Sequence, residues 1–378
     1  LAHRTPDRVP IDFGSTTVSG IHALCVAELC DYYGLESRPV KIFEPFQMLG
    51  LIDDDLKQAM GIDVEGVYGR KTMFGFANDR WKEWRFHGCD MLVSDQFVTT
   101  EDANGDLLIY PEGDLTAAPS GRMPKGFYFF DAIIRQNHFD DDNLNPDDNT
   151  EEFKVLSDAD IATIAADVRE AQATGRAIVA NLGGMGFGDI ALVPAPFLKD
   201  PRGIRDITEW YVSLRARKDY VHKIFERQTE VALQNLERGF AAFGDSIDAL
   251  FICGTDFGTQ SSSFCSVATF RELWLPYYKA ICEWIHRNTT WRCFKHSCGS
   301  VERFYDSFIE AGFDIINPVQ CSAAGMDPQP LKDRYGNRLV FWGGGIDTQQ
   351  VLPFGTPEQV REQVLARCEI FAKHGGFV

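Results

Sequence analysis

From Arg176 onward the sequence alternates continuous apolar runs with amphipathic stretches, and this rhythm limits the possible folds. The strand-like runs are "RAIVANLGG", "DALFICGTD", "WRCFKH", "FDIINPV" and "RLVFWGGGI". Stretches of helical periodicity, such as 217–244, 270–288 and 300–312, lie between them. Strands that read as continuously apolar and alternate with helices are typical of a parallel sheet covered on both faces.

The number of strand-like runs favours one closure of that sheet. "RVPIDFG" and "GIDVEGV" near the N-terminus and the final "GGFV" bring the count close to eight. We therefore predict an α/β fold of the TIM (β/α)8 barrel type. Thr356 and Pro357 predict the start of the last helix, since Thr caps and Pro fits the first turn. A doubly wound sheet is the structural alternative, because strand count alone does not exclude it.

Residues 80–150 interrupt the rhythm. Asn104-Gly105 and Glu112-Gly113 separate alternating stretches there, which is typical of β-hairpins. No linker rich in Pro, Gly or Ser and no internal repeat is found. We predict a single domain over 1–378, with residues 80–150 as a β-hairpin insertion over the barrel mouth.

Composition excludes several classes of partner. The net charge of −18 disfavours nucleic acid, whose binding depends on Lys and Arg. No apolar run reaches the roughly 20 residues of a membrane span, and no secretory segment is visible. The ten cysteines are scattered without a Cys-x-x-Cys pair, which indicates reduced thiols and a cytoplasmic location.

The charge is partly local, because residues 140–152 hold seven acidic residues and no basic one. Charge blocks of this kind are usually solvated loops. The abrupt first and last residues predict short tails beyond the printed sequence.

Polar side chains follow four successive apolar runs, where a barrel places its reacting groups. They are Asp256 and Gln260; His296 and Cys298; Asn317, Gln320 and Cys321; and Asp347 and Gln349.

His296 and Cys298 are spaced so that both side chains project from one side of an extended strand. Imidazole nitrogen and thiolate sulfur are preferred zinc ligands, and a catalytic zinc site needs three protein ligands and one open position. Two other readings stay open for the pair. One is a core histidine beside a buried thiol, and the other is a metal-free Cys298 nucleophile activated by the helix that follows.

The other candidates also have two interpretations. Cys321 is either a third zinc ligand or a small residue that fills a loop. Asp256 is either a general acid or base that contacts substrate, or a carboxylate bonded to backbone amides of its own loop. The glycine-rich segment 181–189 lacks nucleotide-binding spacing and a P-loop lysine, so we interpret it as a rim loop.

Five segments together resemble the uroporphyrinogen decarboxylase superfamily, and more closely its corrinoid-dependent methyltransferase branch. They are "DRVPIDFG", "TDFGTQ", "KHSCGS", "INPVQCSAAGMDP" and "FWGGGIDTQQVLPFGTPEQV", in matching order over nearly the whole chain. True decarboxylases of this superfamily carry an arginine-rich "RQAGR" segment after the first strand. This chain has "DFGSTTVSG" there, which disfavours a porphyrin with eight carboxylates.

The resemblance implies a TIM barrel and a site in which His296 and Cys298 bind zinc. It places another cysteine ligand near the last strand, at or beyond Gly375–Val378, so Cys321 and a residue after Val378 both stay open as third ligand. It implies transfer of a methyl group between a small methylated substrate (a methoxy compound, amine or thiol) and the cobalt of a corrinoid (cobalamin). Asp256 would be catalytic.

The resemblance leaves Gln260, Asn317, Gln320 and Asp347 as supporting substrate contacts. The corrinoid-binding signature Asp-x-His-x-x-Gly is absent from the sequence, so a separate corrinoid protein is the expected partner. It would dock at the barrel mouth, with the hairpin insertion and the acidic loop as contact surfaces. The chain could also form a homo-oligomer.

Two rival functions remain at this stage. One is a metal-independent lyase that resembles uroporphyrinogen decarboxylase, and the other is a non-catalytic binding subunit. The identity of the substrate, the direction of methyl transfer and the oligomeric state do not follow from the sequence.

Overall fold

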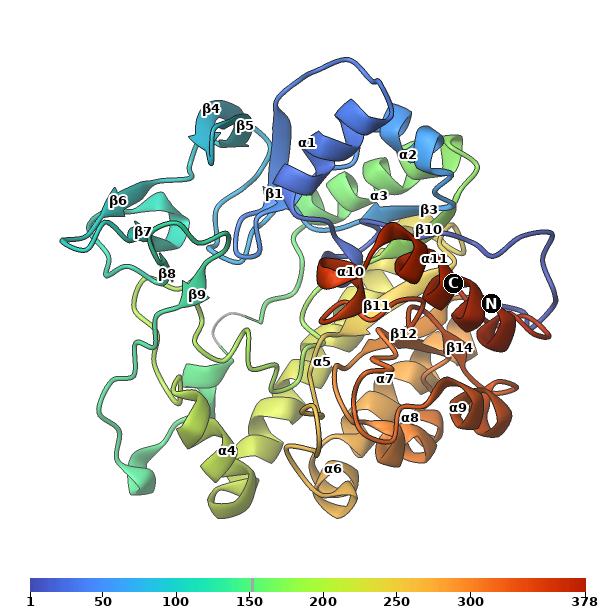
Figure 1. The fold of residues 1–378 in the computed structure, drawn as a ribbon. Coiled ribbons are helices and arrows are strands. Elements are labelled where there is room, and N and C mark those ends of the chain that lie inside the picture. The colour runs from blue at the N-terminus through green and yellow to red at the C-terminus, as the bar shows by residue number, and fades with distance from the viewer. Residues whose placement is uncertain (151–152) are drawn as a thin grey trace.

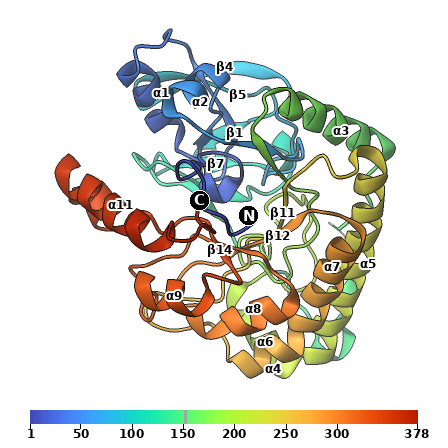
Figure 2. The same ribbon diagram turned by 90° about the vertical axis from the view of Figure 1, so that its right-hand side faces the viewer.

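The protein is described by a computed structural model that covers residues 1–150 and 153–378 (Figures 1 and 2). Within these residues its largest sheet has six strands in the order β14-β13-β12-β11-β10-β3, and every neighbouring pair is parallel. The strands are β3 (Val64–Val67), β10 (Ala177–Ala180), β11 (Ala249–Cys253), β12 (Arg292–His296), β13 (Ile315–Asn317) and β14 (Val340–Phe341). The predicted parallel α/β sheet is confirmed.

The parallel sheet curls on itself. Val64 of β3 and Val340 of β14 belong to one buried cluster, although these strands form opposite edges of the sheet. Large side chains fill the space between them, among them Phe251, Phe294 and Trp342. The cluster includes residues of all six strands, from one edge of the sheet to the other, which fits a sheet that bends around a common interior, as in a (β/α) barrel.

The last residues of the chain lie beside β14, and the segment around Ile11 lies beside β3, at the other edge of the sheet. Phe377 pairs with Phe341 of β14 in parallel, and the amide of Asp63 donates to the carbonyl of Ile11 over 2.8 Å. The strand predicted at 8–14 is not found among these described residues. Pro10 has no N–H to donate to a sheet, which explains why this segment makes single hydrogen bonds and not a ladder.

Helices cover the outer face of the sheet, with α5, α7, α8 and α9 on the side of β11 to β14 (Figures 1 and 2). Thr356 and Gln359 form a capping box at the start of the last long helix, with Pro357 in its first turn as predicted. The helices are α1 (Ala23–Tyr32), α2 (Asp54–Met60), α3 (Asp158–Ala173), α4 (Ile207–Ala216), α5 (Lys218–Phe243), α6 (Val267–Leu273), α7 (Leu275–Asn288), α8 (Tyr305–Ala311), α9 (Pro328–Tyr335), α10 (Val351–Phe354) and α11 (Pro357–Phe371).

Two further sheets lie beside the parallel one and pack on a core of their own (Figure 1). One has the order β2-β1-β5-β4, and the other is antiparallel with the order β6-β7-β8-β9. Their strands are β1 (Val40–Glu44), β2 (Leu49–Gly50), β4 (Trp81–Phe86), β5 (Cys89–Ser94), β6 (Thr99–Glu101), β7 (Leu107–Ile109), β8 (Gly121–Met123) and β9 (Asp131–Ala132).

Asn104-Gly105 lies between the paired strands β6 and β7, whereas Glu112-Gly113 lies in a short 3-10 helix. The single domain over 1–378 and the boundaries of the insertion at 80–150 stay predictions. The last two residues of the acidic segment 140–152 lie outside the described residues.

In the described part of the chain, no helix has the length and apolarity that crossing a membrane requires. All ten cysteines of the sequence lie within the described ranges and are free thiols.

Candidate active site and metal centre

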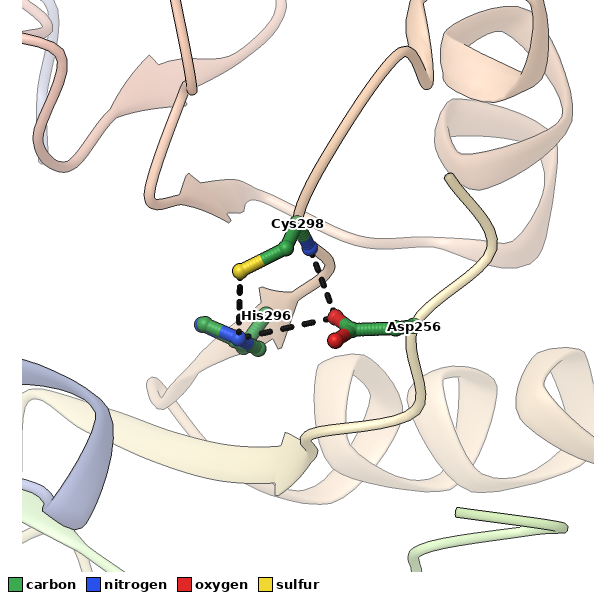
Figure 3. Close-up of side chains that lie close together, drawn as sticks. All are labelled: Asp256, His296 and Cys298. Atoms are coloured by element: carbon green, nitrogen blue, oxygen red, sulfur yellow. Dashed lines mark hydrogen bonds and ion pairs between the residues drawn. The ribbon is translucent and has the colours of Figure 1, made fainter. Parts of the chain in front are cut away.

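Asp256, His296 and Cys298 converge at the carboxyl ends of β11 and β12 (Figure 3). The Nε2 atom of His296 lies 3.4 Å from Sγ of Cys298 and 3.6 Å from Oδ1 of Asp256. One ligand atom from each residue falls within 4.8 Å of the other two. Two neighbouring strands therefore deliver a carboxylate, an imidazole and a thiol to one point.

Lys295 holds the two strand ends together from the opposite side of β12. Its side chain is fully buried, and Nζ donates to the carbonyl of Thr255 over 2.6 Å and to the carbonyl of His296. The ammonium also lies 5.1 Å from the ring centroid of Phe257, at cation–π distance. One buried cation thus fixes the backbone beside both Asp256 and His296.

The backbones of the loops that follow β11 and β12 are in close contact. Gly299 has φ +85°, and a Cβ atom there would lie 2.5 Å from the carbonyl carbon of Gly258. A side chain at Gly258 would in turn lie 2.7 Å from the carbonyl oxygen of Cys298. This close approach lets the amide of Cys298 donate to Oδ1 of Asp256 over 2.6 Å.

Asn317, the last residue of β13, selects the tautomer of His296. The amide nitrogen of Asn317 donates to the carbonyl of Trp342 over 2.9 Å, which turns its Oδ1 toward Nδ1 of His296. Since that oxygen only accepts, Nδ1 carries the proton and donates over 2.5 Å. The lone pair of Nε2 then faces Cys298 and Asp256.

Burial sets the charge states of His296 and Cys298. It lowers the pKa of His296, so the imidazole is neutral at pH 7. Burial, together with the charge of Asp256, raises the pKa of the Cys298 thiol to about 12. The expected activation of Cys298 by a following helix is wrong, because the first helical residue after it is Glu302 and the thiol is desolvated.

The donor set fits a zinc ion. A neutral imidazole with a free Nε2, a thiol that a cation converts to thiolate, and a carboxylate are all zinc ligands. The Nδ1–H of His296 also has the outer partner that metal-bound histidines usually have. Cys321 lies elsewhere, with Sγ 3.2 Å from the carbonyl of Val319 and 3.8 Å from that of Gly344, so its role as a third ligand stays a prediction.

The predicted substrate-binding side chains at the rim are bonded to one another. Oε1 of Gln320 accepts from the amide of Gly299 over 2.8 Å, and its Nε2 donates to Gln260, which in turn donates to Gln349. Oδ1 of Asp347 accepts from the amides of Gln349 and Gln350 in its own loop, at 2.8 and 3.1 Å. Contacts of these residues with substrate stay predictions.

Asp189, which our reading of the sequence passed over, is a second carboxylate near Asp256. Its Oδ1 accepts from the amide of Ala191 over 3.0 Å, and its Oδ2 lies 3.1 Å from the position of a Cβ on Gly254. Burial raises the pKa of Asp189 to about 6, and the charge of Asp256 contributes to this. The only signal was its place at the end of the glycine-rich segment after β10.

A narrow pocket with aromatic walls opens beside Asp256. The hydroxyl of Tyr211, one of the lining residues, is buried without a hydrogen-bond partner in the described residues. The aromatic residues that line the pocket are Trp210, Tyr211, Phe257, Phe264 and Trp274. A polar atom buried without a partner is costly, so this hydroxyl is available to a ligand or a water molecule.

Residues 197–378, which carry β11 to β14 and the Asp256–His296–Cys298 cluster, match the family described as uroporphyrinogen decarboxylase (URO-D). Over this part, the chain is similar to that family. Among solved structures, a methyltransferase from Methanosarcina mazei has a similar fold, with a TM-score of 0.51 and 11% sequence identity. The match covers 98% of this chain and 86% of that chain. No curated protein shows significant sequence similarity to this chain.

Proposed function

We propose that this protein is a zinc-dependent methyltransferase. It moves a methyl group between a small methylated substrate and the cobalt of a corrinoid that a separate protein carries. The observation that carries the proposal is the convergence of His296, Cys298 and Asp256, with the lone pair of Nε2 aimed into the cluster. The fold shared with a methyltransferase is in keeping with it.

His296 and Cys298 hold the zinc ion in this proposal, and Asp256 is close enough to be the third ligand. Cys321 and a residue that follows Val378 remain the alternatives predicted from the sequence. When bound, zinc stabilises a thiolate or polarises an ether or alcohol oxygen, which makes a methyl group easier to transfer.

The residues around the cluster position the substrate. The pocket of Tyr211 and its aromatic neighbours forms an apolar wall beside Asp256, against which the substrate lies. The free hydroxyl of Tyr211 is the polar contact in this pocket. Asp189, which is partly protonated near pH 6, exchanges a proton with the heteroatom that loses or gains the methyl group.

The corrinoid protein docks where the carboxyl ends of the strands open, because the transferred methyl group must reach its cobalt. Leu352 and Phe354 of α10 are exposed by 52% and 80% beside the Gln260–Gln320–Gln349 rim. Exposed apolar side chains at a rim are typical of protein contact sites. The free thiols fit a cytoplasmic location.

A metal-independent lyase is the second candidate, and two observations favour it. The family match is to a decarboxylase, and Asp189 lies close enough to Asp256 for the charge of Asp256 to help raise the pKa of Asp189. Exhaustive chelation separates the candidates, because a lyase of this kind keeps its activity without zinc.

The test of the proposal is zinc content and methyl transfer of the full-length protein, measured beside a His296→Ala, Cys298→Ala double variant. We expect the variant to hold one zinc ion fewer per chain than the parent and to lose transfer from methylated substrates to a Co(I) corrinoid protein. Cys25→Ser, which changes an exposed cysteine, is the control and should keep both. Equal zinc in the parent and the double variant would contradict the proposed site.

A further inference from the structure

A second group of metal-ligating side chains lies at the amino-terminal end of the same strands. Cys293 is the second residue of β12, Asp314 directly precedes β13, and His286 is in the last turn of α7. One ligand atom from each lies within 4.8 Å of the others. This group is at the opposite end of β12 from His296.

The ligand atoms of the group lie close to one another. Nε2 of His286 lies 2.8 Å from Oδ2 of Asp314 and 3.7 Å from Sγ of Cys293. Zinc bonds of about 2.0–2.3 Å in a tetrahedron put imidazole nitrogen and sulfur about 3.6 Å apart. The observed spacing between nitrogen and sulfur is therefore close to that of a tetrahedral zinc site. The hydrogen-bonded nitrogen and carboxylate oxygen would have to separate by about 0.5 Å to bind the same ion.

Cys282 lies beside Cys293 and is the candidate for a fourth ligand, although it falls outside the group of three. It precedes His286 by four residues, so both side chains lie on one face of α7. Its thiol is within hydrogen-bonding reach of Cys293, and both cysteines are fully buried. A Cβ on Gly312 would lie 2.8 Å from Cβ of Cys282, so glycine lets the β12–β13 connection close over this face.

The surroundings match those of a structural zinc site. The amide of Cys293 donates to Oδ2 of Asp314 over 2.8 Å, and Arg292 contacts the other carboxylate oxygen at 3.4 Å. Outer partners of this kind orient ligating carboxylates. The side chain of His286 is 37% exposed, which gives an ion access from solvent.

We propose that Cys282, His286, Cys293 and Asp314 form a second, structural zinc site that fastens α7 to β12 and β13. With four protein ligands this site has no open coordination position, which is typical of structural zinc sites. The inference does not depend on the proposed methyltransferase function, because none of its ligands belongs to the candidate active site.

The test is zinc per chain in the full-length protein and two double variants, purified without added metal. We expect two zinc ions in the parent, one in His296→Ala, Cys298→Ala, and one in His286→Ala, Cys293→Ser. His87→Ala with Cys25→Ser, which changes an exposed histidine and an exposed cysteine, is the matched control and should keep two.

His296→Ala, Cys298→Ala does not change any ligand of the second site. The test therefore still works if His286→Ala, Cys293→Ser fails to fold. One zinc that persists in His296→Ala, Cys298→Ala supports the second site, even if the parent also holds only one. No zinc in that variant would overturn the inference and leave the proposed function standing. In Co(II)-loaded His296→Ala, Cys298→Ala protein, thiolate-to-cobalt absorption bands should remain, and Cys282→Ser should weaken them.

Discussion

The Nδ1 atom of His296 donates a hydrogen bond to Oδ1 of Asn317 over 2.5 Å. Because the amide nitrogen of Asn317 is bonded to the carbonyl of Trp342, the asparagine cannot offer a donor to the ring. Side chains from β12 and β13 thus settle which histidine nitrogen faces Cys298. This relationship leads to the first prediction.

Replacing Asn317 with Ala removes the acceptor of Nδ1–H and frees both the tautomer and the orientation of His296. We expect zinc affinity to fall about 10- to 100-fold, as is usual when an outer partner of a metal ligand is lost. Competition with a chelator measures it. Asn288→Ala, which removes a bond to the backbone of α7, is the control and should leave the affinity unchanged.

Asp256→Asn separates the two roles of the carboxylate. The amide oxygen still accepts from the amide of Cys298, so the loop should keep its shape. We expect methyl transfer to fall about 100-fold or more, as for a lost acid–base group. The zinc content of the variant then shows which role Asp256 has. If Asp256 is a zinc ligand, the variant loses zinc; if it acts only as an acid or base, the variant keeps zinc. Activity equal to the parent's would rule out both roles.

Gly299→Ala should disturb the site through the backbone. The new Cβ meets the carbonyl carbon of Gly258 at 2.5 Å, and φ +85° is strained for alanine. We expect a loss of about 2–4 kcal/mol in the free energy of unfolding, from left-handed strain and overpacking together. Gly69→Ala meets no atom within 4 Å and should be neutral in the same urea titration. Equal unfolding midpoints would show that the two loops separate easily.

Asp189→Asn should stabilise the protein at neutral pH. Burial raises the pKa of this carboxyl from 3.8 to about 6, so the folded state binds more protons than the unfolded state between these values. Stability therefore falls as pH rises through this window, and the full cost is present above pH 6. At about 1.4 kcal/mol per pKa unit, the gain at pH 7.5 is up to about 3 kcal/mol.

The gain from Asp189→Asn should shrink to about half at pH 5, where most of the parent's Asp189 carboxyl is protonated in the folded state. Urea unfolding of both proteins at the two pH values measures it. A gain that does not change with pH would mean that the carboxyl is not desolvated.

Phe354→Ser should weaken the contact with the corrinoid protein. The ring is 80% exposed on α10, whose neighbouring loop reaches the Gln260 rim. We expect the KM for the corrinoid protein to rise about tenfold, since burying such a ring contributes roughly 1.5–3 kcal/mol. The KM for the small substrate should not change. Tyr32→Ser on α1, where the ring is 81% exposed, is the matched control.

Local patterns in the sequence predicted most of the parallel sheet. The apolar runs at β10 to β14 became its strands, and the Thr356–Pro357 start became a capped helix. The strand expected at 8–14 failed because a proline removes a donor from the ladder. Asp189 was overlooked because the glycines before it suggested only a flexible loop.

The sequence by itself determined which side chains follow which strands, since periodicity and strand ends are local properties. It placed His296, Cys298 and Asp256 at neighbouring strand ends. Only the tertiary structure decided that Asn317 holds the histidine, that Cys321 lies against Val319 and Gly344, and that His286, Cys293 and Asp314 meet. These contacts depend on strand register and on the curl of the sheet, which bring together residues that lie far apart along the chain.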